Sequence, residues 1–242
     1  MKYHYWWFTC LFVISLQCYA EKLDIVTIDL APFGYNETFD KVPRGIFFDF
    51  ANQVVQEVGV EYDNIVKPYA RVVHELKVGM ADMTIMFPSD QVRKIAHLVE
   101  PILMLENIVV GLPSSRYDRY EDLFGKTLGS IREAVYDQRV SDAKDINLYY
   151  TNNYKQSINM LLAKRFEGII GVKRSIDFEL SRLGYSSDIL GSPLNINKKQ
   201  AWLLISNKAN LSNEIVERIR ISAVRLKKEH RIEQILKKYR NL

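Results

Sequence analysis

A short stretch after the second expected strand carries side chains suited to holding a small anionic molecule. Tyr69 and Arg71 stand at the start of an expected helix, and Phe87, Ser89 and Arg93 follow an expected buried strand. In an open α/β sheet, both places face the crevice outside the carboxyl ends of the strands, where ligands bind. A guanidinium binds a carboxylate through two parallel hydrogen bonds. The stretch therefore predicts capture of a small, carboxylate-bearing ligand against aromatic side chains.

Further candidates stand at comparable places elsewhere in the chain. Phe33 and Tyr35 are the aromatics of the loop that follows the first expected strand. Arg132 lies at a strand-to-helix turn, where backbone N–H groups and the helix dipole favour anions. Tyr136 and Thr151 complete the predicted ligand-binding set. The alternative for the arginines is a solvated or ion-paired surface position, and for the aromatics it is ordinary loop packing.

The elements that must position these residues follow from the hydrophobic pattern. Strands are expected at 22–30, 60–66, 82–87, 102–112, 127–131, 146–150, 166–172 and 201–206. Helices are expected at 47–57, 69–78, 133–140, 154–165, 175–183, 212–229 and 231–239. Strand and helix alternate, pause at the polar segment 113–120, and alternate again. Such alternation favours parallel sheets with helices on both faces, divided between two small lobes with a crevice between them.

Composition and motifs narrow the class of function. The 242 residues are 48% hydrophobic and 26% charged, which is typical of a globular protein, and the net charge of +4 is too mild to indicate a nucleic-acid partner. The four histidines lack metal-ligand spacing. The sequence has no phosphate loop, dinucleotide fingerprint or serine nucleophile motif. We therefore expect a non-enzymatic protein with no catalytic residue, metal or cofactor.

Residues 1–20 are expected to be a signal peptide that is cleaved after Ala20. Their apolar run, 6–16, has the length of a secretory core and is shorter than the roughly 20 residues that a membrane span needs. An uncleaved anchor and a lipoprotein modified at Cys18 are the alternatives. Cys10 and Cys18 both lie in this segment, so the exported chain would contain no cysteine. We expect a soluble, monomeric protein of the periplasm.

Several short patterns, in order along the chain, resemble those of the family 3 extracytoplasmic solute-binding proteins, which include the periplasmic polar amino-acid-binding components of ABC importers. The matching segments are the opening strand and aromatic loop at 21–35, the first helix at 45–59, a Leu-Gly-Asp turn at 76–82, Arg93 with Glu100-Pro101, the entry to a second lobe at 123–129, a turn at 161–168 and a closing helix at 232–239.

The resemblance implies a periplasmic binding protein type II-like fold, with two α/β lobes joined by a two-crossing hinge. Residues 21–111 with 195–242 would form lobe 1, and 112–194 would form lobe 2. A ligand would be trapped as the lobes close and delivered to an importer, so the expected partner is a membrane permease or, alternatively, a sensor protein. A periplasmic component of a signalling system and a small dehydratase-type enzyme on the same fold are the alternative functions.

The resemblance also implies roles for single residues. Arg93 matches the arginine that grips the ligand carboxylate in the family's amino-acid binders. Two departures stand against a standard α-amino acid. The loop before Arg93 holds Met86, Phe87 and Pro88 in place of small hydroxyl residues, and Val172 stands near the position of the acid that binds the ammonium group. A carboxylate or another small organic molecule held against aromatic side chains is therefore expected at least as much as an amino acid.

Overall fold

The computed structural model describes residues 22–37 and 41–239. The expected signal peptide and its cleavage after Ala20 lie outside the described residues. Within those two ranges, no helix combines the length and the apolar character that crossing a membrane requires.

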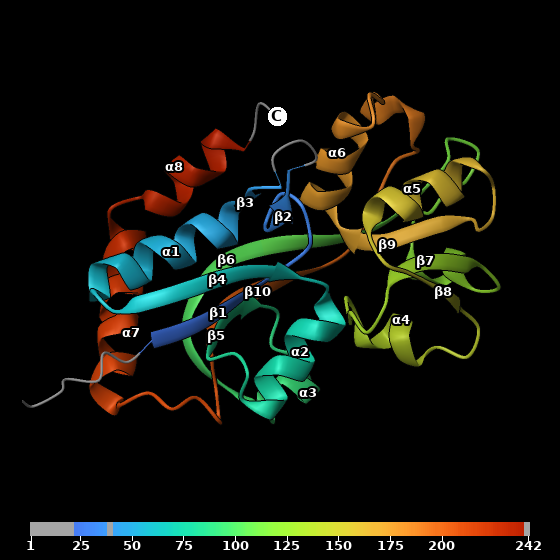
Figure 1. The fold of residues 1–242 in the computed structure, drawn as a ribbon. Coiled ribbons are helices and arrows are strands. Elements are labelled where there is room, and N and C mark those ends of the chain that lie inside the picture. The colour runs from blue at the N-terminus through green and yellow to red at the C-terminus, as the bar shows by residue number, and fades with distance from the viewer. Residues whose placement is uncertain (1–21, 38–40, 240–242) are drawn as a thin grey trace, which may run out of the picture.

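One eight-stranded sheet, of order β4-β1-β5-β10-β6-β9-β7-β8, runs through the whole molecule (Figure 1). Three parallel strands lie at each end of it. The first trio is β4 (Glu61–Lys67), β1 (Lys22–Ile28) and β5 (Met83–Met86), and the second trio is β9 (Gly168–Val172), β7 (Thr127–Ile131) and β8 (Asn147–Thr151). A short separate hairpin pairs β2 (Tyr35–Asn36) with β3 (Pro43–Arg44).

Two long strands connect the trios. They are β6 (Ala96–Gly111) and β10 (Leu194–Ser206), which run antiparallel to each other and to the strands beside them. The expected parallel pairing is found within each trio, whereas the two crossing strands add antiparallel pairing at the centre of the sheet. Both strands also begin six or seven residues before the expected 102 and 201, because the first residues of each strand are ordered by pairing with the last residues of the other, which the sequence pattern does not show.

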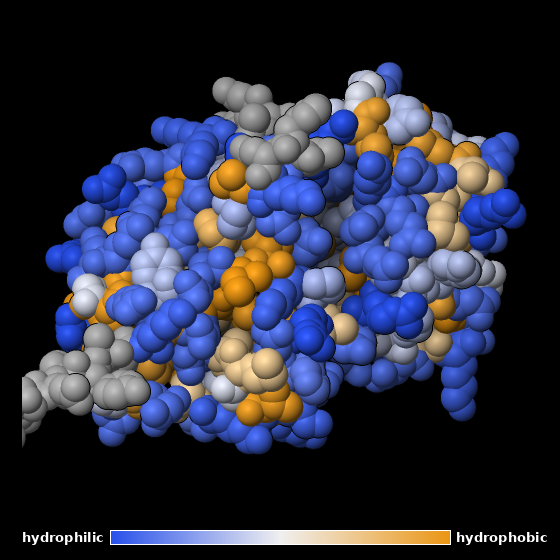
Figure 2. Space-filling view, in the orientation of Figure 1, coloured by the Kyte–Doolittle hydropathy of each residue, from blue (hydrophilic) through white to orange (hydrophobic). Residues whose placement is uncertain are grey.

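Helices cover both faces of the sheet on either side of the crossing strands (Figure 1). The first half of the molecule is the first trio with α1 (Ile46–Val58), α2 (Tyr69–Val78), α3 (Asp90–Arg93), α7 (Asn213–Lys228) and α8 (Arg231–Lys238). The second half is the second trio with α4 (Gln138–Asp142), α5 (Tyr154–Leu162) and α6 (Lys173–Arg182). Short 3₁₀ turns occur at Tyr120–Leu123 and Ser187–Ile189. Figure 2 shows that hydrophilic residues cover most of this face, with a hydrophobic patch near its middle.

Strand β1 shows why this layering arises. Leu23 and Ile25 belong to the core cluster that contains the inner side of α1. Val26 and Ile28 belong to a second cluster, which contains the inner side of α2. A strand that is buried on both faces is expected in a parallel sheet covered by helices. The first cluster continues through the crossing strands into the second half, so one core spans the molecule.

The helix expected at 133–140 is largely absent. Glu133 has a left-handed backbone, with φ of 64°, and the chain then turns before α4 begins at Gln138. Asp137 caps this helix by accepting a hydrogen bond from the backbone N–H of Arg139 at 2.8 Å. The segment before the cap is an irregular loop, residues 132–137, which we call the tyrosine loop because it presents Tyr136.

Candidate functional site

A mainly apolar cavity lies where the carboxyl ends of the two trios face each other. Its lining draws on the end of, or the segment after, every strand of both trios, and on the two crossing strands between them. About 50 Å³ of it is open to the centres of water-sized molecules, which corresponds to roughly three to five waters. The lining residues are Ile28, Asp29, Leu30, Phe33, Phe47, Tyr69, Met86, Phe87, Leu105, Ile131, Ala134, Tyr136, Asn152, Val172 and Ala201.

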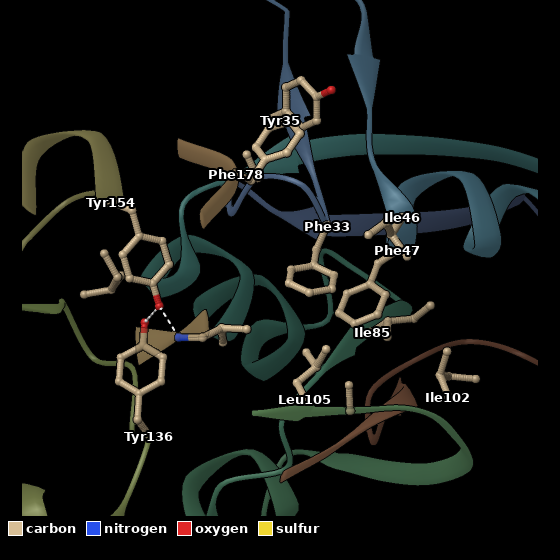
Figure 3. Close-up of a cluster of buried hydrophobic side chains, with 14 of the residues drawn as sticks. Phe33, Tyr35, Ile46, Phe47, Ile85, Ile102, Leu105, Tyr136, Tyr154 and Phe178 are labelled. Carbon is tan, nitrogen blue, oxygen red and sulfur yellow. Dashed lines mark hydrogen bonds between the residues drawn. The ribbon is translucent and has the colours of Figure 1, made fainter. Parts of the chain in front are cut away.

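The wall from the first half is built of aromatic rings. The rings of Phe33 and Phe47 stack with their centroids 4.6 Å apart (Figure 3). Their contact depends on Gly45, which has a φ of 141° and precedes α1. A side chain at this position would collide with the Phe33 carbonyl, to which the Phe47 N–H donates at 2.9 Å. Tyr69 adds a third ring to this wall.

The wall from the second half is held by buried hydroxyl groups. Tyr154 is 2% exposed, and its hydroxyl accepts a hydrogen bond from the Val172 N–H at 2.8 Å and donates to the Tyr136 hydroxyl at 2.9 Å (Figure 3). Burial raises the pKa of both tyrosines, so both stay protonated at neutral pH. Gly171 leaves room for the Tyr154 ring. These two hydrogen bonds, which we call the tyrosine relay, hold Tyr136 and Val172 in place, and both residues line the cavity.

The backbone of the tyrosine loop is tied to the crossing strands. Asn197 of β10 donates to the Tyr136 carbonyl at 3.0 Å and to the Asp137 carboxylate at 2.7 Å. It accepts a hydrogen bond from Asn107 of β6 at 2.8 Å. Lys199 donates to the Val135 carbonyl at 3.0 Å. The second wall is thus attached to both crossing strands, next to the irregularity in their pairing between Asn195 and Asn197.

Four of the predicted residues come together in the cavity lining: Phe33, Tyr69, Phe87 and Tyr136. Tyr35 does not line the cavity, because its ring faces Phe178 of α6, with 5.5 Å between centroids (Figure 3). The Arg182 guanidinium lies 5.2 Å from the centroid of the same ring. Tyr35 therefore connects the first half to the second beside the cavity.

The three predicted arginines and two hydroxyl residues lie outside the lining. Arg71 is 62% exposed and pairs with the buried Glu75 at 3.2 Å. Arg93 and Arg132 are exposed. Ser89 caps α3 by accepting the Val92 N–H at 3.4 Å. Thr151 is buried and shares a 2.6 Å hydrogen bond with the Ser157 hydroxyl. Ligand contacts by these side chains stay a prediction.

Sequence reasoning missed the two polar residues that join the aromatic lining, Asp29 and Asn152. Asp29 directly follows β1, and Asn152 directly follows β8. The signal was available, because a polar residue immediately after a buried strand lies at the crevice edge of the sheet. Crowding by the surrounding protein raises the pKa of Asp29, although the residue keeps accessible surface, and nearby Arg182 lowers it.

The described residues contain no group of three or more His, Cys, Asp and Glu side chains placed to hold a metal ion. The lining of the cavity is suited to recognition by shape, aromatic contact and a few polar groups.

An α/β sheet divided by two crossing strands, with a cavity at the carboxyl ends of both trios, is the fold of the periplasmic-binding-protein-like domains. The solved structures confirm this fold class. A mutant of ArgBP from T. maritima superposes with a TM-score of 0.78 at 17% identity, over 91% of this chain and 96% of that one. AbpA from Streptococcus pneumoniae, an amino acid ABC transporter substrate-binding protein bound to L-arginine, gives 0.76 at 18% identity, over 90% and 94%.

A third similar structure belongs to a different kind of protein. It is a histidine kinase sensor domain with similarity to periplasmic binding proteins, with a TM-score of 0.76 at 16% identity, over 90% of this chain and 96% of that one. No protein-family model and no curated protein matches the chain by sequence. Identities this low establish the fold that was expected from the sequence, and the function has to be argued from the site.

Proposed function

We propose that this protein is an extracytoplasmic solute-binding protein, which captures a small organic molecule between its two halves and presents it to a membrane partner. The observation that carries the proposal is the composition of the cavity lining, which takes residues from the carboxyl ends of both trios. A ligand that touches both halves favours the closed arrangement by its contacts to each.

The hinge of this movement would lie in the crossing strands. We place it near Asn107 of β6 and between Asn195 and Asn197 of β10, where the pairing of the two strands shifts register. The two lobes would then correspond to the predicted division at about residues 111 and 195. The cavity supports binding in preference to catalysis, because the described residues that line it are mainly apolar and aromatic, with one carboxylate and with no histidine, lysine, serine or cysteine.

The membrane partner would be the permease of an importer. Two of the structural neighbours are substrate-binding proteins of amino acid transport, which favours this partner over the sensor kinase of the third. Export through the expected signal peptide would place the protein on the same side of the membrane as that permease. Mass spectrometry of the exported protein checks cleavage after Ala20, and co-purification with the product of a neighbouring permease or kinase gene separates transport from sensing.

A distance measurement between the two halves tests ligand-driven closure. Residues after position 20 contain no cysteine, so labels can be placed at Met80→Cys in the first half and Tyr149→Cys in the second, which are 62% and 48% exposed. A matched pair within the first half, Met80→Cys with Ile221→Cys, serves as the control. A metabolite that raises the melting temperature should shorten only the first distance. A stabilising metabolite that leaves both distances unchanged would contradict closure, and conversion of the metabolite to a product would contradict a binding-only role.

A further inference from the structure

The charge of the cavity lining limits the chemical class of the ligand. Of the described side chains that line it, Asp29 alone has a carboxyl group, and none is a lysine, arginine or histidine. A ligand carboxylate would enter a cavity with no cation on its wall and with a carboxylate at its edge. Burying the negative charge of the ligand without a cationic partner would cost free energy. The lining therefore favours a ligand of the opposite sign.

The Asp29 carboxylate is free to receive a partner. Its backbone N–H donates to the Lys67 carbonyl at 2.7 Å, which fixes the position of the residue. Its side chain makes no hydrogen bond or ion pair with any residue in 22–37 or 41–239. Arg182, whose charge lowers the pKa of Asp29, donates to Glu179 at 3.0 Å and lies over the ring of Tyr35. It lines an adjoining hollow together with Asp29 and Lys155. Asp29 thus places an exposed carboxylate, unpaired among the described residues, at the edge of the cavity.

The residues around Asp29 suit an ammonium group with an apolar body. Asn152 lines the same cavity from the second half, and within the described ranges its side-chain amide has no hydrogen-bond partner. An amide oxygen and a carboxylate both accept hydrogen bonds from an ammonium group. The rings of Phe33, Phe47 and Tyr69 offer apolar surface, and an aromatic face also attracts a cation.

We propose that the ligand is a small organic monocation, a primary alkyl or arylalkyl amine, whose ammonium group binds Asp29 and Asn152 while its apolar body lies along the aromatic wall. This inference rests on the proposed solute-binding function. It differs from the carboxylate-bearing ligand predicted from Arg71, Arg93 and Arg132, because those guanidiniums lie outside the lining. The space within the cavity suits a body of a few heavy atoms, and a ring-bearing body would need the two halves to stand farther apart.

The test compares probes that differ only in charge. Butylamine, butan-1-ol and butyrate share one chain length, and phenethylamine, 2-phenylethanol and phenylacetate form a second set with a ring. Thermal shift and calorimetry are carried out on the full exported chain at neutral pH with each probe. The expected result is stabilisation by one or both amines, with each corresponding alcohol and acid bound at least about ten-fold more weakly.

Two variants test whether the preference for a cationic ligand arises from Asp29. Asp29→Asn keeps the shape and removes the charge, so amine affinity should fall by about ten-fold to a hundred-fold. Asp188→Asn changes an exposed acid that is outside the cavity lining and should leave affinity unchanged. The melting temperature of unliganded Asp29→Asn should match that of the natural protein, because Asp29 is exposed and its side chain has no hydrogen-bond or ion-pair partner among the described residues. A merely structural Asp29 would give a lower melting temperature instead.

The outcomes separate this inference from the function on which it rests. Binding of an acid with no binding of its amine overturns the monocation and leaves the solute-binding function standing. Amine binding that is unaffected by Asp29→Asn also overturns the assignment to this cavity. If no amine binds, and a wider metabolite screen finds a ligand of another class that closes the two halves, the inference alone fails. If no metabolite stabilises the protein or closes it, both fail.

Discussion

The two walls of the cavity are built in different ways. The first wall consists of rings from a loop, from two helix starts and from the end of β5, and these rings pack on each other and on an apolar core. The second wall rests on a polar network that runs from Val172 through Tyr154 to Tyr136, and from the Tyr136 carbonyl to Asn197. Apolar packing tolerates small shifts better than a buried hydrogen-bond network, which is stable only when every member is paired.

This difference suggests that the two walls have different roles in ligand binding. The first wall contributes Asp29 and most of the rings, so it carries more of the chemistry that distinguishes one ligand from another. The second wall connects the cavity to the crossing strands through the tyrosine loop, so it would carry more of the proposed closing movement. A ligand that presses on Tyr136 acts on a residue whose backbone is bonded to β10. Substitutions at four positions test this comparison.

The largest effect is expected from Tyr154→Ala. This change removes a buried ring and both relay hydrogen bonds, so the free energy of unfolding should fall by roughly 3 to 5 kcal/mol. Tyr154→Phe keeps the ring but leaves the Val172 N–H without its acceptor, at a cost of about 1 to 3 kcal/mol. Urea unfolding measures both, and Tyr149→Phe, on the exposed side chain of a neighbouring strand, should change stability by under about 0.5 kcal/mol. Equal values for Tyr154→Phe and Tyr149→Phe would show that the relay does not hold the second wall.

The attachment of the tyrosine loop gives a pH-dependent prediction. Hydrogen bonds from Arg139 and Asn197 lower the pKa of Asp137, although burial opposes them as the largest single influence. A lowered folded-state pKa stabilises the protein above the unfolded value, near 3.9, and this stabilisation is lost as pH falls through the folded value. Asp137→Asn should therefore cost about 1 to 3 kcal/mol at pH 7 and progressively less below pH 4. A constant difference between the two proteins from pH 7 to pH 2.5, measured by urea unfolding, would contradict this role.

A smaller effect is expected where the two halves touch beside the cavity. Phe178→Leu keeps apolar volume but removes the ring that faces Tyr35, so it should weaken closure by about 0.5 to 1.5 kcal/mol. The Met80→Cys and Tyr149→Cys labels should then lie farther apart on average in the unliganded protein. Phe124→Leu, at a ring of the second half that is 46% exposed, is the control. An unchanged distance distribution in Phe178→Leu would show that the Tyr35 contact does not favour the closed arrangement.

The sequence predicted the first wall better than the second, for a physical reason. Phe33, Tyr69 and Phe87 follow hydrophobic runs whose period reveals a strand or a helix, so their place at the crevice follows from the pattern. The tyrosine loop was expected to be a helix, because nothing in its composition shows the left-handed turn at Glu133 or the bond from Asn197, a residue 61 positions after Tyr136. The early start of β10 was missed for the same reason, since its first residues are polar and are ordered by pairing with β6.

The arginines of the first half provide the smallest and last test. Arg71 and Lys67 both pair with Glu75, which is only 2% exposed, and Lys67 approaches it more closely, at 2.7 Å against 3.2 Å. Arg71→Ala leaves Lys67 in place, so it should cost only about 0.2 to 0.5 kcal/mol of stability. Its guanidinium is outside the cavity lining, so ligand affinity should change less than about two-fold, as for Lys77→Ala on the same helix. A ten-fold loss of affinity, measured by calorimetry, would show that Arg71 contacts the ligand and would favour an anionic ligand. In the structure described here, Arg71 pairs with Glu75 and cannot reach a ligand in the cavity at the same time. Such a result would therefore mean that the two halves are arranged differently when the ligand is bound.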